Sequence, residues 1–166
     1  MELGTAIIAL VILFACIMPF IVISRSNKKR DNQFLQVLSD QSKAFHLSIS
    51  QYDIWNNAAI GTDASFNMIF FNKKSGDLNI HQQITLVEVE KCWVVNTNRT
   101  IGNPSGDQKV IDKLELAFNY RETGKPDTIL VFYDANSDSL VMSGEIQLAD
   151  KWCKIANDKI ESLRQK

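Results

Sequence analysis

The chain has 166 residues, of which 45% are hydrophobic and 22% charged, and its formal net charge is −1. The charge is unevenly placed, because residues 31–166 hold 14 basic against 18 acidic side chains, a net charge of −4. An acidic body is a poor electrostatic match for nucleic acid and for broad adhesion to an anionic membrane leaflet, so the composition argues against both.

Residues 4–24 form a run of 21 residues without a charged side chain. A helix rises about 1.5 Å per residue, so the run is long enough for a hydrocarbon core of roughly 30 Å. Pro19 lies inside the run and removes one helical hydrogen bond, which membrane helices tolerate. We therefore predict an N-terminal transmembrane anchor over residues 1–25.

Three other interpretations of this run fit the sequence less well. A cleaved signal peptide needs a basic start, a shorter apolar core and a small-residue cleavage site, whereas the chain begins Met1-Glu2-Leu3. The segment from Leu13 to Cys16 resembles a lipoprotein cleavage box slightly, but the apolar run continues past Cys16. A buried helix of a soluble protein rarely has an apolar run of this length. A single membrane span explains the run best.

The two flanks of the run predict its orientation. The N-terminal flank carries Glu2 and no basic side chain, whereas the C-terminal flank carries Arg25, Lys28, Lys29 and Arg30. By the positive-inside rule the N-terminus lies outside and residues 25–166 lie in the cytoplasm. The four basic side chains would also lie against anionic headgroups, although their effect on topology alone is enough to explain them.

The cysteines indicate no disulfide framework and no zinc pattern. Cys92 and Cys153 each stand next to a tryptophan and are expected to be buried free thiols. Cys16 lies in the predicted span, and no CxxC occurs. The pairs Cys92-Trp93 and Trp152-Cys153 could form a redox couple, but core packing between sheet and helix explains them better.

After the basic cluster the sequence predicts one amphipathic helix and then short strands. Residues 31–47 place apolar side chains near one helical face, at Phe34, Leu35, Leu38, Ala44 and Phe45. Residues 49–55 are interpreted as a connector. Apolar or alternating runs then predict strands over residues 58–61, 66–71, 78–86, 90–95, 113–120 and 127–133. Residues 62–65, 72–77 and 123–127 are predicted as turns, and residues 96–108 as a polar loop.

The last segment, residues 144–163, is predicted to be an amphipathic helix. Its apolar stripe consists of Ile146, Ala149, Trp152, Cys153, Ala156, Ile160 and Leu163. Strands without intervening helices favour an antiparallel arrangement. The predicted fold class is therefore α+β: a strongly bent antiparallel sheet or small barrel, with the C-terminal helix covering its open side. The predicted organisation is an anchor (1–25), a juxtamembrane basic segment with the amphipathic helix (26–54), and the β-domain with its helix (55–166).

This order of elements resembles the pleckstrin-homology-like fold, as carried by small bacterial membrane proteins on an N-terminal anchor. The resemblance covers about residues 55–163 and rests on residues 60–63, 68–71, 84–89, 92–95, 129–134 and 149–152. Members that bind phosphoinositides use Lys and Arg around the first strand-to-strand loop. Here the loop over residues 62–65 holds Asp63 and no basic residue, so the resemblance does not extend to that ligand. Other members bind peptides, which requires only an exposed edge or groove.

No constellation of catalytic residues is recognised. His46 and His81 have no partners at a spacing that suggests acid–base or metal chemistry. Asp63, Asp134 and Glu145 are explained by turn and cap roles. We therefore expect no catalytic, metal or cofactor site, and a non-enzymatic, membrane-tethered cytoplasmic interaction domain whose partner is a protein. The alternative is a lipid-sensing or small-ligand-sensing domain at the inner membrane face.

Overall fold

The computed structural model describes residues 28–101, 108–138 and 142–165. In these ranges the chain is α+β, with an N-terminal helix through residues 28–43 and a C-terminal helix α2 (Glu145–Arg164). Between them lie the strands β1 (Ile49–Trp55), β2 (Ala58–Asp63), β3 (Met68–Ser75), β4 (Leu78–Thr85), β5 (Val89–Ile101), β6 (Gln108–Tyr120) and β7 (Thr128–Asp134). A short 3₁₀ helix η1 (Leu86–Glu88) joins β4 to β5.

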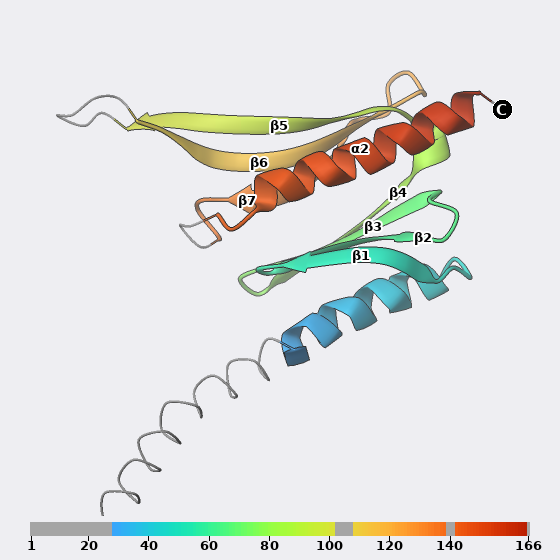
Figure 1. Ribbon diagram of the computed structural model, residues 1–166, viewed down its shortest axis with the longest axis horizontal. Helices are drawn as coiled ribbons and strands as arrows, with labels where there is room; N and C mark the ends of the chain where they lie inside the picture. The colour runs from blue at the N-terminus through green and yellow to red at the C-terminus, as the bar shows by residue number, and fades with distance from the viewer. Residues whose placement is uncertain (1–27, 102–107, 139–141, 166) are drawn as a thin grey trace, which may run out of the picture.

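The strands form two antiparallel sheets. One sheet has the order β1-β2-β3-β4 and the other β5-β6-β7, and every neighbouring pair is antiparallel. The two sheets face each other and α2 runs along the open side between them (Figure 1). The predicted α+β class, with antiparallel strands and a C-terminal helix, is confirmed at this level.

Helix α2 closes the main core, as its apolar stripe predicted. Ala149, Trp152, Ala156 and Ile160 are buried at helical spacing. Trp152 is fully buried, and its indole Nε1 donates a hydrogen bond to Asp53 Oδ2 at 2.8 Å. Ile146 is 37% exposed, because at this turn the buried position is taken by Glu145. The Glu145 carboxylate accepts hydrogen bonds from Asn56 and from the backbone of Ser143.

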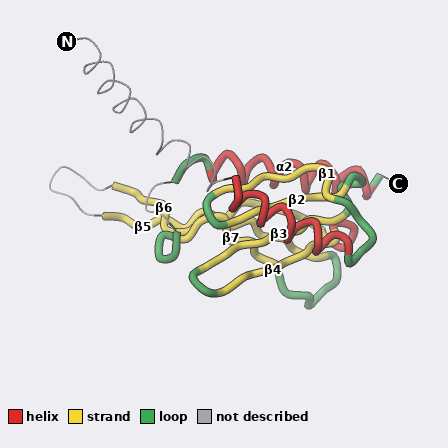
Figure 2. Tube along the Cα trace, turned by 90° about the horizontal axis from the view of Figure 1, so that it is seen from below, coloured by secondary structure: helices red, strands yellow, loops and turns green. Residues whose placement is uncertain are grey.

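The N-terminal helix packs on the other face of the β1–β4 sheet and forms a second core. Phe34 and Leu38 are buried there against Ala59 and Phe70, and the helix lies across this sheet in Figure 2. The predicted helix over 31–47 ends earlier, at residue 43. Phe45 is therefore 40% exposed instead of lying in the stripe.

The β1–β4 sheet is covered on both faces, which explains the burial of β2. All six of its residues are buried, without the alternation of a half-exposed strand. Gly61 permits the close approach of the N-terminal helix. A Cβ at this position would lie 3.2 Å from Ile49 Cγ2 and 3.4 Å from Leu38 Cδ1.

Three of the local predictions are wrong. Residues 49–55 are not a connector but strand β1, which pairs with β2 through a tight turn at Asn56. The predicted turn 72–77 is shorter, because β3 continues to Ser75. Residues 96–101 of the predicted loop 96–108 belong to β5 and pair with residues 108–114 of β6 as a two-stranded ribbon, and residues 102–107 lie outside the described residues. Polar residues lie on both faces of this ribbon, so its sequence lacks the apolar alternation from which a strand is predicted.

The predicted membrane span, residues 4–24, and Arg25 lie outside the described residues. Within the ranges that are described, neither helix combines the length and the apolar character needed to cross a membrane. The first strand-to-strand turn is now Asn56-Asn57, and not residues 62–65 as expected. This turn also carries no basic residue.

Candidate functional site

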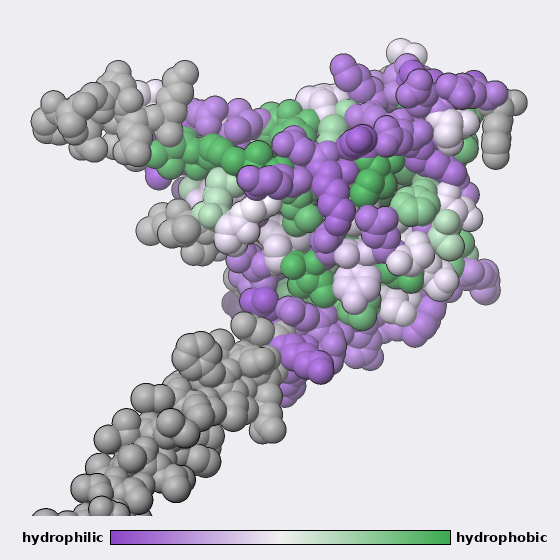
Figure 3. Space-filling view, viewed as in Figure 1, coloured by the Kyte–Doolittle hydropathy of each residue, from purple (hydrophilic) through white to green (hydrophobic). Residues whose placement is uncertain are grey.

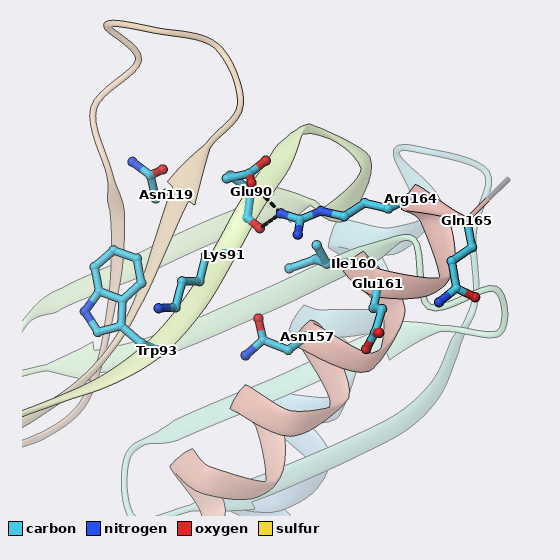
Figure 4. A pocket seen from close by; sticks show the side chains of 9 residues that line it. All are labelled: Glu90, Lys91, Trp93, Asn119, Asn157, Ile160, Glu161, Arg164 and Gln165. Atoms are coloured by element: carbon cyan, nitrogen blue, oxygen red, sulfur yellow. Dashed lines mark hydrogen bonds and ion pairs between the residues drawn. The ribbon is translucent and has the colours of Figure 1, made fainter.

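An open groove of about 900 Å³ lies between β5 and the last turns of α2. Figure 4 shows its two walls, with Arg164 reaching from α2 to Glu90 on β5. The lining side chains come from β5 (Glu90, Lys91, Trp93), from β6 (Asn119), and from α2 and the residue after it (Asn157, Ile160, Glu161, Arg164, Gln165). The groove thus joins segments that are far apart in the sequence.

The local structure explains which side chains reach the groove. Successive side chains of a strand point to opposite faces, so Cys92 enters the core while Lys91 and Trp93 lie on the other side. Glu90 also lines the groove, at the irregularity in the β5 register between Val89 and Lys91. On α2, Asn157 and Glu161 are one turn apart, and Arg164 follows within the next turn. Trp93 is half-buried and Lys91 is exposed. The groove therefore has an aromatic surface beside exposed charge.

The outer edge of β5 is occupied at the groove by side chains of α2. In its sheet β5 is an edge strand, so half of its backbone groups have no neighbouring strand. The Cys92 N–H donates to Asn157 Oδ1 at 3.1 Å, and Asn157 Nδ2 donates to the Cys92 carbonyl at 2.8 Å. Arg164 donates to the carbonyl of Glu90. Side chains of α2 thus make the hydrogen bonds that a further strand would otherwise make with this part of the β5 edge.

The charged side chains of the groove balance each other. Two acidic residues, Glu90 and Glu161, and two basic residues, Lys91 and Arg164, line it. Arg164 and Glu90 form an ion pair at 2.6 Å, but both are about half-exposed, so the pair contributes little to stability. Within the ranges described, Lys91 and Glu161 belong to no ion pair, so both charges are free to meet a ligand.

Cys92 on β5 and Cys153 on α2 lie next to each other beside the groove. Cys153 Sγ is 3.5 Å from the Cys92 carbonyl oxygen and 3.5 Å from Asn157 Nδ2. A hydrogen bond from Cys92 lowers the pKa of Cys153 to about 7, against the opposing effects of burial and Asp150. The same hydrogen bond, together with burial, raises the pKa of Cys92. Cys153 therefore loses its proton first. Cys92 is buried as predicted, whereas Cys153 is only half-buried.

The predicted membrane-flanking residues lie away from the groove. Lys28 and Lys29 are exposed on the N-terminal helix, and Arg30 is half-buried with its guanidinium 3.1 Å from Asp31 Oδ1. The remaining member, Arg25, lies outside the described residues. Contact of these residues with headgroups stays a prediction.

The turn roles expected of Asp63 and Asp134 are confirmed, whereas Glu145 lies in the first turn of α2 without a side-chain cap hydrogen bond and accepts from Asn56 and Ser143 instead. Asp63 accepts hydrogen bonds from the backbone N–H groups of the turn after β2, and Asp134 accepts one from Asn136. His46 and His81 are both exposed. In the described ranges no group of three or more His, Cys, Asp or Glu residues could hold a metal ion.

Lys73 has a role that the sequence did not suggest. It falls in the segment predicted as a turn, residues 72–77, but it is buried on β3 and pairs with Asp138 at 2.6 Å. The groove itself was also missed. The only available signal was Asn157, a polar residue one position from the apolar stripe of α2, and its partner Cys92 is 65 residues away.

Comparison of the chain with protein-family models, with curated proteins and with solved structures finds no match. The class of protein is therefore defined by the fold and the groove alone: an α+β domain of two antiparallel sheets with a C-terminal helix, and a charged groove beside that helix.

Proposed function

We propose that this chain is a non-enzymatic interaction domain that binds an extended segment of another protein in the groove between β5 and α2. The observation that carries the proposal is the groove itself, because about 900 Å³ is ample for several side chains of a partner. Its half-buried Trp93 offers aromatic contact area, which interfaces favour at their centres. Lys91 and Glu161 supply opposite charges on opposite walls.

The occupied edge of β5 defines how a partner would bind. A peptide that added itself as a strand would have to displace Asn157 from both backbone groups of Cys92. Breaking those hydrogen bonds costs more free energy than pairing with an exposed, unoccupied strand edge would, because the bonded groups are partly buried. The partner segment therefore contacts side chains of the groove and does not extend the β5-β6-β7 sheet.

Tethering at the inner face of the membrane is part of the proposal. It rests on the predicted span over residues 4–24 and on the basic flank of Arg25, Lys28, Lys29 and Arg30. The pleckstrin-homology-like fold is likewise proposed, and the four-stranded and three-stranded antiparallel sheets with a terminal helix support it. A reporter fused after Lys166 tests the orientation, since a cytoplasmic signal is expected and an extracytoplasmic signal would refute it.

The alternative function, sensing of a lipid or small ligand, is not favoured by the groove. The formal charges of its lining residues sum to zero, so the groove has no net electrostatic attraction for an anionic headgroup. Hydrophilic side chains are numerous on the face that carries α2, with apolar patches between them (Figure 3). This surface suits a partner that matches charges one by one, as a polypeptide does.

Proximity labelling from the full-length chain in its native cells tests the function. We expect a defined set of labelled proteins. Lys91→Glu replaces a positive groove charge with a negative one, so the labelling of this set should fall at least about tenfold. Lys154→Glu is the matched control, because Lys154 is exposed on α2 and does not line the groove. Identical labelling by the two variants would refute docking in the groove.

A further inference from the structure

A second pocket, of about 320 Å³, lies between the N-terminal helix and the hairpin of β3 and β4. It is separate from the groove beside α2. The helix contributes Arg30 and Phe34, β3 contributes Asn72 and Lys74, and β4 contributes Asn79. The pocket therefore forms only when the N-terminal helix is docked on the sheet.

The pocket is basic. Arg30 and Lys74 are the charged side chains among its lining residues, and no acidic residue lines it. Strand alternation separates Lys74 from Lys73, because Lys73 points into the core and pairs with Asp138. Lys74 has no ion-pair partner in the ranges described. Unlike the groove, this pocket carries a net positive charge inside a chain that is acidic beyond residue 30.

One wall of the pocket has an unused hydrogen-bonding group. Asn72 is only 4% exposed, and its Oδ1 has no hydrogen-bond partner among the described residues. An orphaned buried amide is costly unless something else satisfies it. The orphaned atom is an acceptor, so Oδ1 needs an O–H group of the ligand, either the P–OH of free phosphate or an alcohol of a lipid headgroup, while Nδ2 can donate to a phosphate oxygen. Asn72 lines the pocket, so a ligand there would be its partner.

The pairing of Arg30 with Asp31 does not close the site. The two side chains are 41% and 43% exposed, and adjacent exposed ions of this kind interact weakly. A guanidinium also has five N–H donors, so Arg30 can keep Asp31 and still bind a second oxyanion. Its planar fork matches the geometry of two phosphate oxygens, while Lys74 adds a point charge.

We propose that this pocket binds a phosphate-bearing anionic group, with Arg30 and Lys74 as its charge partners and Asn72 as its hydrogen-bonding partner. The group is either the headgroup phosphate of a lipid or a soluble phosphate. Arg30 follows the predicted span by six residues, which reach about 20 Å at most when fully extended. This distance keeps the pocket near the headgroup layer. The proposal does not depend on a protein partner in the groove.

Nuclear magnetic resonance of the full chain in lipid nanodiscs tests the site, read at the side-chain amide of Asn72. One arm uses pure phosphatidylcholine nanodiscs and titrates inorganic phosphate. The other arm compares these nanodiscs with ones containing phosphatidylglycerol. We expect a saturable shift of the Asn72 signal in at least one arm. A shift with lipid alone assigns a headgroup, and a shift with free phosphate alone assigns a soluble ligand.

Charge-matched variants distinguish a specific binding site from nonspecific electrostatic attraction. Arg30→Gln and Lys74→Gln should each weaken the apparent affinity at least about tenfold, the loss of one charge-assisted contact. Lys29→Gln removes the same charge from the same helix but does not line the pocket, so it should change the affinity less than about twofold. No shift in either arm, or equal weakening by all three variants, would overturn the proposal.

Discussion

Asn157 of α2 holds both backbone groups of Cys92 on β5, accepting from its N–H at 3.1 Å and donating to its carbonyl at 2.8 Å. A side-chain amide has the donor and acceptor spacing of a peptide group, so Asn157 stands in for the strand that β5 lacks on this side. This contact ties the covering helix to the edge of the three-stranded sheet. It also forms the inner wall of the groove.

Replacing Asn157 with Ala should destabilise the domain by about 1–3 kcal/mol, because two partly buried backbone groups of Cys92 lose their partner. Chemical denaturation of the full chain in detergent measures the change. Lys154→Ala serves as the control, since Lys154 is exposed on the same helix and should change stability by less than about 0.5 kcal/mol. Equal stability of the two variants would contradict the role given to Asn157.

Cys153 should react as a thiolate near neutral pH. Its pKa is lowered to about 7, chiefly by the hydrogen bond from Cys92, so about half of it is deprotonated at pH 7. Alkylation by iodoacetamide, quantified for Cys153 by mass spectrometry, should have its half-maximal rate near this pH. Cys92→Ala removes the donor and should move the profile to higher pH. The same profile with and without Cys92 would show that the pair is not coupled.

Lys73 should be far more important for stability than its neighbour Lys74. The Lys73–Asp138 pair is buried, with side chains 3% and 5% exposed. Lys73→Met leaves the Asp138 carboxylate buried without a counter-charge, and we expect a loss of about 3–5 kcal/mol. Lys74→Met, on the exposed side of the same strand, should cost less than about 0.5 kcal/mol.

The double variant Lys73→Met with Asp138→Asn removes both charges and keeps an acceptor for the Asp134 N–H, which now bonds Asp138 at 2.8 Å. It should recover a large part of the loss. A double variant no more stable than Lys73→Met alone would show that packing around Lys73, and not the unpaired charge, causes the effect.

Local pattern was enough to predict most of the elements of this fold. The alternation of Leu114, Leu116 and Phe118 marks a face that is fully buried on β6, and the stripe through Trp152 marks the covering helix. Strand β1 was missed because its residues mix polar and apolar types, and its strand character comes from pairing with β2. The outer half of the β5–β6 ribbon was missed for the same reason.

The candidate sites are harder to predict from the sequence, because they depend on contacts between residues that are far apart in the chain. Asn157 and Cys92 are 65 residues apart, as are Lys73 and Asp138. Neither pair follows from spacing along one element. Arg30 was recognised as basic, but its place beside Lys74 and Asn72 results from the packing of the N-terminal helix on the β1–β4 sheet.

Site-specific photo-crosslinking in native cells tests the central claim, docking of a protein segment in the groove, most directly. A benzophenone amino acid is placed at Glu161 in the groove or at Lys154 outside it, with Trp93 intact or changed to Ala. Position 161 should give an adduct with one defined protein, position 154 should not, and Trp93→Ala should abolish the adduct. The same adducts at both positions, or an adduct at 161 that survives Trp93→Ala, would contradict the account.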